Sequence, residues 1–262
     1  MKLTSAWRKY ERGIEQAREL CGKTRAFEEA QAYVPNVKTY IRSQQEVEYV
    51  ILADERATPP DDLALMAGEV VYNLRSSLDH AVYALVRKNR GQSQFPIFTD
   101  MCEFQVKGRP MIKGVPPAIC TLIEKRQPYI HSATAPALDP LAILNSFSNR
   151  DKHRELATVA TAVEFTSVGH DSGVKISEWL MPLSVGHVLH HDAEIARFIA
   201  TFEDSIDQMN VQPKFTYEVR IQRRRLIQTV RWMSNGVFEC LVECETGQPI
   251  SPVQQGYPAL LF

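Results

Sequence analysis

The chain has 262 residues, which is near the upper limit for a single hydrophobic core. Hydrophobic residues make up 44% and charged residues 23%, a balance that argues against an intrinsically disordered chain. Thirty basic and 31 acidic residues leave a formal net charge of −1, so overall charge does not indicate a basic nucleic-acid binder.

The cysteines and the hydropathy pattern predict the compartment. Five cysteines are scattered along the chain without a Cys-x-x-Cys pair, which argues against a disulfide framework and favours a reducing environment. No charged segment followed by an apolar run opens the chain, and no apolar run reaches about 18 residues. We therefore expect a cytoplasmic protein with no membrane span.

The first half of the chain predicts two helices that flank a hairpin. Apolar residues recur at three- and four-residue steps over residues 3–31, which is typical of an amphipathic helix. Alternating residues within 37–53 predict a β-hairpin. A long helix is expected over residues 59–90, with Thr58 as its N-cap and Pro59 as its first residue.

The second half predicts shorter elements. Seven prolines between residues 91 and 140 favour short helices joined by loops, and a helical region is expected over 115–147. Alternation of apolar residues predicts strands within 155–182 and 213–222.

Two further segments have helical spacing. The apolar residues of 193–208 fit a helix, with an irregular excursion as the alternative, and a last helix is predicted over 224–245. Helices at both ends with strands between them predict one elaborated α+β domain over residues 1–262. It would combine a helical bundle with a small antiparallel β-sheet.

The predicted 59–90 helix carries a line of polar side chains apart from its apolar stripe. At 100° per residue they fall within about 40° of one line. They are Glu69, Asn73, Ser76, His80, Tyr83 and Arg87. Arg75 stands four residues before Asp79, so the two side chains can pair and fix the guanidinium. Packing alone does not select such a line, so this helix is the candidate functional centre.

The spacing of Arg75 and His80 resembles the Arg-x4-His motif of the HEPN superfamily. Its members are all-α bundles, and many are RNA-cleaving toxins or phage-defence nucleases. The resemblance implies a metal-independent endoribonuclease in which two protomers meet across a dimer cleft. His80 would transfer protons at the attacking 2′-hydroxyl or the leaving oxygen, and Arg75 would hold the scissile phosphate. Asp79 would orient Arg75.

A second resemblance covers residues 5–245 and concerns a family of uncharacterised bacterial proteins, for which it implies no reaction. Four ordered blocks carry it. They are Asn73-Leu74-Arg75 through Leu78-Asp79-His80, Phe95-Pro96-Ile97, Gln127-Pro128-Tyr129 and Asp151-Lys152-His153-Arg154.

The last of these blocks concentrates charge, and we expect it to border the Arg75–His80 helix. Lys152, His153 and Arg154 could complete an anion site there, together with Asn73 and Ser76 as substrate-binding residues. The alternative is a solvated turn or an ion-paired link.

Other residue clusters give weaker indications. His187, His190, His191 and Asp192 have a metal-like composition, but their spacing matches no zinc motif. We expect no metal and no cofactor. Arg223-Arg224-Arg225 could meet RNA phosphates or form a solvated strand end.

Three functions therefore stay open, of which the third is a sensor of a small-molecule anion or a nucleotide. The first is RNA cleavage by a homodimer, with RNA as the partner. The rival is a non-catalytic binding or scaffold protein, in which Arg75, Asp79 and His80 form a structural polar network or a ligand pocket. A solvent-open cleft at Arg75 and His80 would favour cleavage, whereas burial with paired polar atoms would favour the rival.

Overall fold

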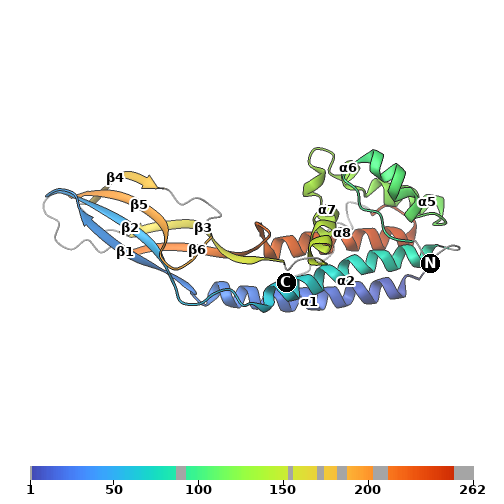
Figure 1. The fold of residues 1–262 in the computed structure, drawn as a ribbon, viewed down its shortest axis with the longest axis horizontal. Coiled ribbons are helices and arrows are strands. Elements are labelled where there is room, and N and C mark those ends of the chain that lie inside the picture. The colour runs from blue at the N-terminus through green and yellow to red at the C-terminus, as the bar shows by residue number, and fades with distance from the viewer. Residues whose placement is uncertain are drawn as a thin grey trace. The chain divides into compact units, whose positions relative to one another are not determined.

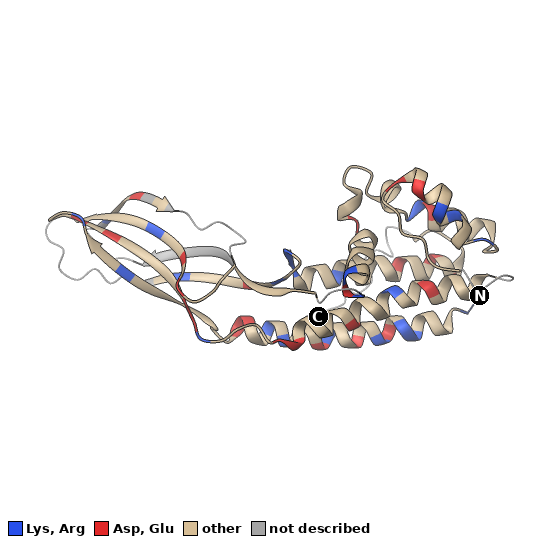
Figure 2. Ribbon diagram, viewed as in Figure 1, with Lys and Arg blue, Asp and Glu red and all other residues tan. Residues whose placement is uncertain are grey.

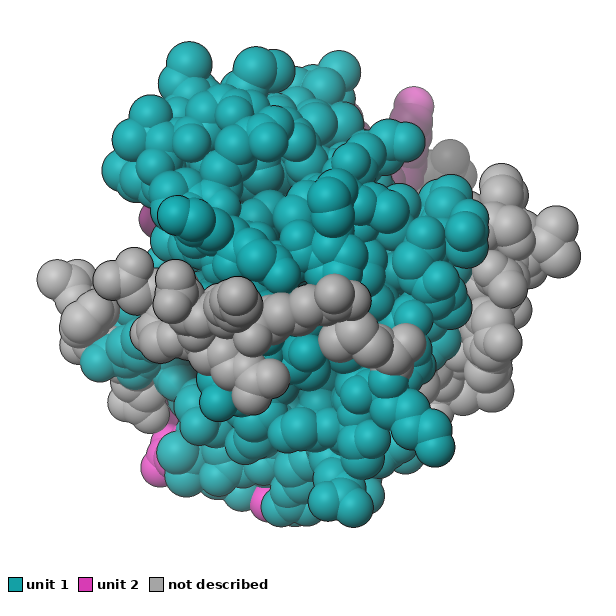
Figure 3. Space-filling view, turned by 90° about the vertical axis from the view of Figure 1, so that its right-hand side faces the viewer, with its two compact units in different colours: residues 1–22, 62–156, 226–262 teal, residues 23–61, 157–225 magenta. Residues whose placement is uncertain are grey.

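The computed structural model of this protein describes residues 2–86, 93–152, 156–169, 174–181, 188–202 and 212–250. It confirms the mixed α+β character (Figure 1). The chain divides into two compact units (Figure 3). Unit 1 holds residues 1–22, 62–156 and 226–262, and unit 2 holds residues 23–61 and 157–225. That the two units behave as one domain stays a prediction.

Unit 1 is helical. Its long helices are α1 (Thr4–Glu29, of which the first part belongs here), α2 (Asp62–Leu85), α7 (Pro140–Asp151) and α8 (Leu226–Thr246). The short elements between α2 and α7 are α3 (Met101–Glu103), the π-helix η2 (Phe104–Gly108), α4 (Arg109–Met111), α5 (Pro117–Lys125), α6 (Pro128–His131) and the 3-10 helix η3 (Pro136–Leu138). Proline occupies a first-turn position in four of them, α4, α5, α6 and η3, and also in α7, because its missing N–H costs nothing there.

The core of unit 1 lies where α2 packs against α7 and α8. The apolar stripe predicted for α2 is confirmed, since Leu74, Leu78 and Leu85 are each 0% exposed. Burial of each such side chain contributes about 1.5–3 kcal/mol to folding. Among the described helices, none combines the length and apolar composition that a membrane span requires.

The predicted start of the long helix is wrong. α2 begins at Asp62 rather than at Pro59. The residue before a proline is driven out of the helical conformation by the proline ring, and Pro59 stands directly before Pro60. A helix could therefore start only after the second proline. Residues 87–90, the predicted end, lie outside the described residues.

Unit 2 holds two antiparallel sheets where we predicted one. The four-stranded sheet has the order β1 (Tyr33–Ile41), β2 (Glu46–Glu55), β5 (Ala193–Phe202) and β4 (Val174–Met181). The three-stranded sheet has the order β3 (Thr158–Gly169), β6 (Gln212–Ile221) and β7 (Arg224–Arg225). The predicted hairpin is confirmed as β1 and β2. Pro35 lies in β1, which is an edge strand of this sheet. A proline is tolerated in an edge strand because one side of that strand has no partner that needs an N–H donor.

Residues 193–202 form the strand β5, so the helix predicted within 193–208 is wrong over this range. β5 lies between β2 and β4 and is buried along much of its length. Its pairing with β2 shifts register between Ala196 and Glu194, which leaves Ile195 as an extra residue. Such a bulge breaks strict alternation, so the apolar spacing imitates a helical period. Residues 203–208 lie outside the described residues.

One tyrosine ties the end of α1 to both sheets of unit 2. The Tyr217 hydroxyl of β6 accepts a hydrogen bond from the Ala32 amide at 2.8 Å and donates one to the Phe27 carbonyl at 3.0 Å. Its ring contacts Phe27 and Tyr33 edge-on. These contacts pair backbone groups that the end of a helix leaves unsatisfied.

Candidate functional site

Arg75 and Asp79 form the predicted ion pair on α2. Arg75 Nη2 lies 3.1 Å from Asp79 Oδ1, and the two side chains are 12% and 27% exposed. Both also bind the backbone of one residue far along the chain. Arg75 Nη2 donates to the Phe95 carbonyl at 2.8 Å, and the Phe95 amide donates to Asp79 Oδ1 at 2.9 Å. The pair therefore clamps the loop that carries Phe95.

A buried glutamine continues this clamp. Gln127 is 0% exposed, donates to the Pro96 carbonyl at 2.8 Å and accepts from the Phe98 amide at 3.0 Å. Three of the four sequence blocks described above thus meet at the loop of residues 95–98. Their meeting point is a set of backbone hydrogen bonds, which is what a structural network provides.

Burial is the largest cause of the pKa shifts of Arg75 and Asp79. It raises the pKa of Asp79, against the lowering effects of Arg75, the Phe95 amide, Lys152 and His80. It also lowers the pKa of Arg75, against the carboxylate of Asp79. Within the described part of the chain, Arg75 Nη1 is buried and has no hydrogen-bond partner.

The polar line of α2 meets α1, and two of its members, Glu69 and Asn73, also line an open pocket of about 540 Å³. Asn73 donates to Gln16 Oε1 at 2.7 Å, and Gln16 donates to Glu69 Oε2 at 2.7 Å. Lys9 Nζ lies 3.4 Å from Asn73 Oδ1 and 5.1 Å from the centre of the Tyr72 ring. The line of polar residues is therefore, in large part, the place where two helices recognise each other.

His80 belongs to the same contact. Its Nδ1 lies 2.7 Å from the Ser5 hydroxyl of α1, and its side chain is half-buried. Ser76 is half-buried as well. His80 does not share a hydrogen bond with Arg75, whose described partners are Asp79 and Phe95.

The structure describes only the first two residues of the charged block Asp151-Lys152-His153-Arg154. A Cβ atom at Gly68 would lie 2.5 Å from Asp151 Oδ1, so Asp151 packs against α2. Gly68 precedes Asp79 by about 16 Å along the helix. The charge of Lys152 lowers the pKa of Asp79, but the two side chains form no ion pair within the described residues. His153 and Arg154 lie outside the described residues.

The sequence analysis missed a histidine–aspartate pair between α6 and α7. His131 Nδ1 lies 2.7 Å from Asp139 Oδ2, and the two side chains are 45% and 1% exposed. Asp139 caps α7 by accepting from the Leu141 amide at 2.8 Å, and it accepts from the Ser132 hydroxyl at 2.8 Å. A buried carboxylate on Nδ1 fixes the orientation of an imidazole and leaves Nε2 for other partners.

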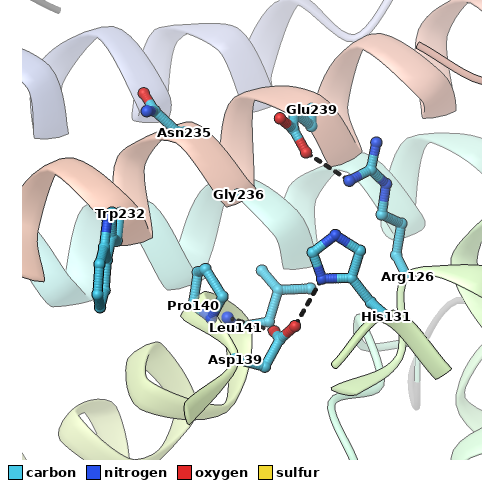
Figure 4. A pocket seen from close by; sticks show the side chains of 9 residues that line it. All are labelled: Arg126, His131, Asp139, Pro140, Leu141, Trp232, Asn235, Gly236 and Glu239. Carbon is cyan, nitrogen blue, oxygen red and sulfur yellow. Dashed lines mark hydrogen bonds and ion pairs between the residues drawn. The ribbon is translucent and has the colours of Figure 1, made fainter. Parts of the chain in front are cut away.

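This pair borders a cavity of about 300 Å³, which we call the His131 cavity (Figure 4). Its lining comes from α8, from the end of α6 and from the start of α7, and comprises Arg126, His131, Asp139, Pro140, Leu141, Trp232, Asn235, Gly236 and Glu239. Trp232 and Glu239 stand at opposite ends of the α8 wall, with Gly236 between them. Trp232 is large and apolar, is 44% exposed and forms part of the lining of this cavity.

Arg126 closes one end of the His131 cavity. It makes a two-pronged contact with Glu243, in which Nε and Nη2 donate to the two carboxylate oxygens at 2.8 Å each, and Nη1 bonds Glu239. Burial alone would lower the pKa of Arg126, but its hydrogen bonds and ion pairs with these carboxylates raise it above its usual value. The guanidinium therefore stays charged and fixed in place.

On the other side of the cavity, the pKa values of His131 and Asp139 shift in opposite directions. The hydrogen bond from Asp139 raises the pKa of His131, against the effect of partial burial. Burial alone would raise the pKa of Asp139, but hydrogen bonds from His131, Ser132 and Leu141 lower it overall. Both shifts stabilise a protonated imidazole beside a carboxylate.

The remaining predicted clusters lie in unit 2. In the described ranges, no group of three or more histidine, cysteine or acidic side chains could hold a metal ion, and His187 lies outside those ranges. His191 instead lies 3.5 Å from Asp54. In the arginine run, Arg225 pairs with Glu218 at 2.9 Å.

Comparisons with protein-family models, with curated proteins and with solved structures found no match to this chain. The HEPN resemblance therefore stays a prediction from the spacing of Arg75 and His80.

Proposed function

We propose that this protein binds a small molecule in the His131 cavity, while Arg75 and Asp79 belong to the scaffold. One observation carries the proposal. The cavity is lined by a histidine whose ring is fixed by a buried carboxylate, whereas the bonds of the Arg75–Asp79 pair are directed at the backbone of Phe95. Convergent polar groups around an apolar wall are the usual composition of a ligand site.

The charge distribution supports a small ligand over a nucleic acid. Basic and acidic residues are interspersed along α1 and α2 in Figure 2, and no block of one sign follows either helix. A nucleic-acid backbone is usually met by clustered lysines and arginines, because affinity comes from neutralised phosphates. The α1–α2 face lacks that pattern within the described residues.

A fragment screen tests this proposal. The full chain, with isotope-labelled histidine, is mixed with small fragments that include anions, cations and uncharged rings. We expect some of them to shift the ring signals of His131 and to lose affinity in Trp232→Leu. Tyr40 is also a large exposed side chain, at 52%, but lies in unit 2, so Tyr40→Leu serves as the matched control. If no fragment shifts His131, the proposal is wrong.

The second candidate is a metal-independent endoribonuclease of HEPN type, acting as a homodimer. Two observations favour it. His80 is half-buried and bonds Ser5 through Nδ1, which leaves Nε2 for a proton, and the charge of Lys152 lowers the pKa of Asp79. In this proposal His80 moves the proton and Arg75 supports the phosphate.

Incubation of metal-free protein with mixed RNA tests the second candidate. Cleavage should survive EDTA and leave 2′,3′-cyclic phosphates, because a 2′-hydroxyl nucleophile produces that group. His80→Ala should lower the rate by roughly 10²–10⁴ without unfolding the chain, since it removes a proton carrier. His190 is exposed and lies in unit 2, so His190→Ala is the control. Intact RNA with the wild type would rule the nuclease out.

A further inference from the structure

We infer that the ligand of the His131 cavity is an uncharged, planar nitrogen heterocycle of one or two rings. This inference rests on the proposed function, namely that the cavity binds a small molecule. It adds the chemical class of that molecule, which follows from three properties of the lining: its charges, its remaining hydrogen-bonding groups and its aromatic wall.

The charges of the lining exclude a charged ligand. Arg126 is bonded to Glu239 and to Glu243, and His131 is bonded to Asp139. Each charged side chain that lines the cavity therefore already has a partner of opposite sign. A ligand anion would find no unpaired cation in this lining, and a ligand cation would compete with Arg126 and His131 for carboxylates that are already bonded. In either case the desolvation of the ligand is costly.

The hydrogen-bonding groups that remain suit a heterocycle. Asp139 already accepts from His131, Ser132 and the Leu141 amide, so its oxygens are occupied. Within the described part of the chain, neither His131 Nε2 nor the Asn235 amide has a hydrogen-bond partner, and both residues line the cavity. An amide both donates and accepts, and Nε2 of a protonated imidazole donates. A ring that carries a donor beside an acceptor complements them.

The wall and the volume set shape and size. Trp232 offers a large aromatic surface on α8, and aromatic rings prefer to pack against other flat rings. A cavity of about 300 Å³ lies at the small end of ligand pockets, which suits one or two fused rings. At Gly236 the wall is closed by Pro140, because a Cβ atom there would lie 3.1 Å from the Pro140 Cβ.

A matched series of probes tests the inference. Nicotinamide is an uncharged planar heterocycle, nicotinate is its anionic counterpart, and the N-methylnicotinamide cation is its cationic counterpart. Cyclohexanecarboxamide keeps the amide but has no planar ring. Titration of the full chain, followed by the ring signals of His131, should give the tightest Kd for nicotinamide. We expect about tenfold weaker binding of each of the other three, because each lacks one matched property.

Two variants assign the effect to named residues. Trp232→Leu should weaken nicotinamide and remove its advantage over cyclohexanecarboxamide, because the flat wall is gone. Asn235→Asp keeps the size of the side chain but adds a negative charge without a partner. It should reverse the preference toward the N-methylnicotinamide cation. Tyr40→Leu should leave all four affinities unchanged. Because Trp232 and Asn235 are exposed, neither substitution threatens the fold.

The outcomes separate this inference from the proposed function. If nicotinamide binds no better than its charged or non-planar counterparts, the inference is overturned. A charged or aliphatic fragment that binds in the earlier screen and responds to Trp232→Leu would still support the proposed function. If no fragment of any class shifts His131, both fall together. A tighter Kd for nicotinamide, reversed by Asn235→Asp, supports both.

Discussion

Two ion pairs in unit 1 contain similar groups and differ in what surrounds them. On α2, Arg75 and Asp79 both hold the backbone of Phe95. Between α6 and α7, Asp139 holds His131, and the ring stands beside a cavity. The first pair directs its hydrogen bonds at the protein itself, while the second leaves a ring nitrogen for another molecule.

A structural network and a binding site can be separated by what surrounds the paired groups. Residue type does not distinguish them, because each pair joins a nitrogen base to a shielded carboxylate. What distinguishes them is whether atoms remain available beside a space large enough for a ligand. Arg75 Nη1 remains without a described partner but is buried, whereas His131 is 45% exposed.

The largest effect is expected at Asp79. Asp79→Ala should lower the free energy of unfolding by roughly 3–5 kcal/mol, because the buried guanidinium of Arg75 would lose its charged partner. The Phe95 amide would lose its acceptor as well. Denaturant titration with the slope held constant measures the change.

An exposed pair with the same spacing provides the control. Glu103 and Lys107 lie 2.8 Å apart at four-residue spacing, with side chains 52% and 60% exposed. Glu103→Ala should cost less than about 1 kcal/mol. Equal costs for Asp79→Ala and Glu103→Ala would contradict the structural role of the α2 pair.

Much of the fold could be predicted because its signals are local. A helix turns by a fixed angle per residue, so the spacing of Leu74, Leu78 and Leu85 places them on one face. All three are buried as expected. Alternation likewise located β1 and β2. β5 was missed because the bulge at Ile195 disrupts its alternation, and its place between β2 and β4 depends on tertiary pairing.

The candidate site was predictable only in part, for the same reason. The pairing of Arg75 with Asp79 follows from four-residue spacing on a helix, but their grip on Phe95 is a tertiary contact. His131 and Asp139 are joined across a proline-rich turn that has no period. One local signal was available, because Asp139 stands directly before Pro140 as an N-cap before a first-turn proline.

Asp139→Ala should have the next largest effect, a loss of roughly 2 kcal/mol. The substitution removes the N-cap of α7 and the partners of His131 and Ser132. Asp100 caps α3 through the Glu103 amide at an exposed position, so Asp100→Ala should cost only about 0.5–1 kcal/mol. Thermal unfolding of both variants measures the difference. A smaller loss for Asp139→Ala than for Asp100→Ala would show that the buried cap is dispensable.

The His131 pair should also give a pH dependence. Because the pKa of His131 is raised on folding, its contribution is fully present below the unfolded value of about 6.5 and is lost as pH rises through the folded value. Because the pKa of Asp139 is lowered, its contribution is present above about 3.9 and is lost as pH falls through the folded value. The pair therefore stabilises the fold most between these limits.

Comparison of the wild type with His131→Gln measures this effect. The advantage of the wild type in unfolding free energy should be larger at about pH 5.5 than at about pH 8.5. Since the ring is 45% exposed, the difference should stay below about 1 kcal/mol. The nearby charges of Arg126 and Glu239 act in opposite directions on this pKa, so neither reverses the sign. An advantage that grows with pH would contradict the pairing.

The smallest expected effect concerns Ser5, and it tests whether His80 is a catalytic or a structural residue. Ser5→Ala removes the contact at His80 Nδ1 from an exposed position, so stability should change by no more than about 0.5 kcal/mol. If His80 carries a proton during RNA cleavage, the Ser5 hydroxyl orients its ring through Nδ1 and leaves Nε2 for the reaction. Cleavage by Ser5→Ala would then fall several-fold while the fold stays intact. If His80 only joins α1 to α2, the loss of this contact has no effect on RNA, and wild type and variant alike leave RNA intact. In that case His80 belongs with Arg75 and Asp79 among the groups whose bonds are directed at the protein itself.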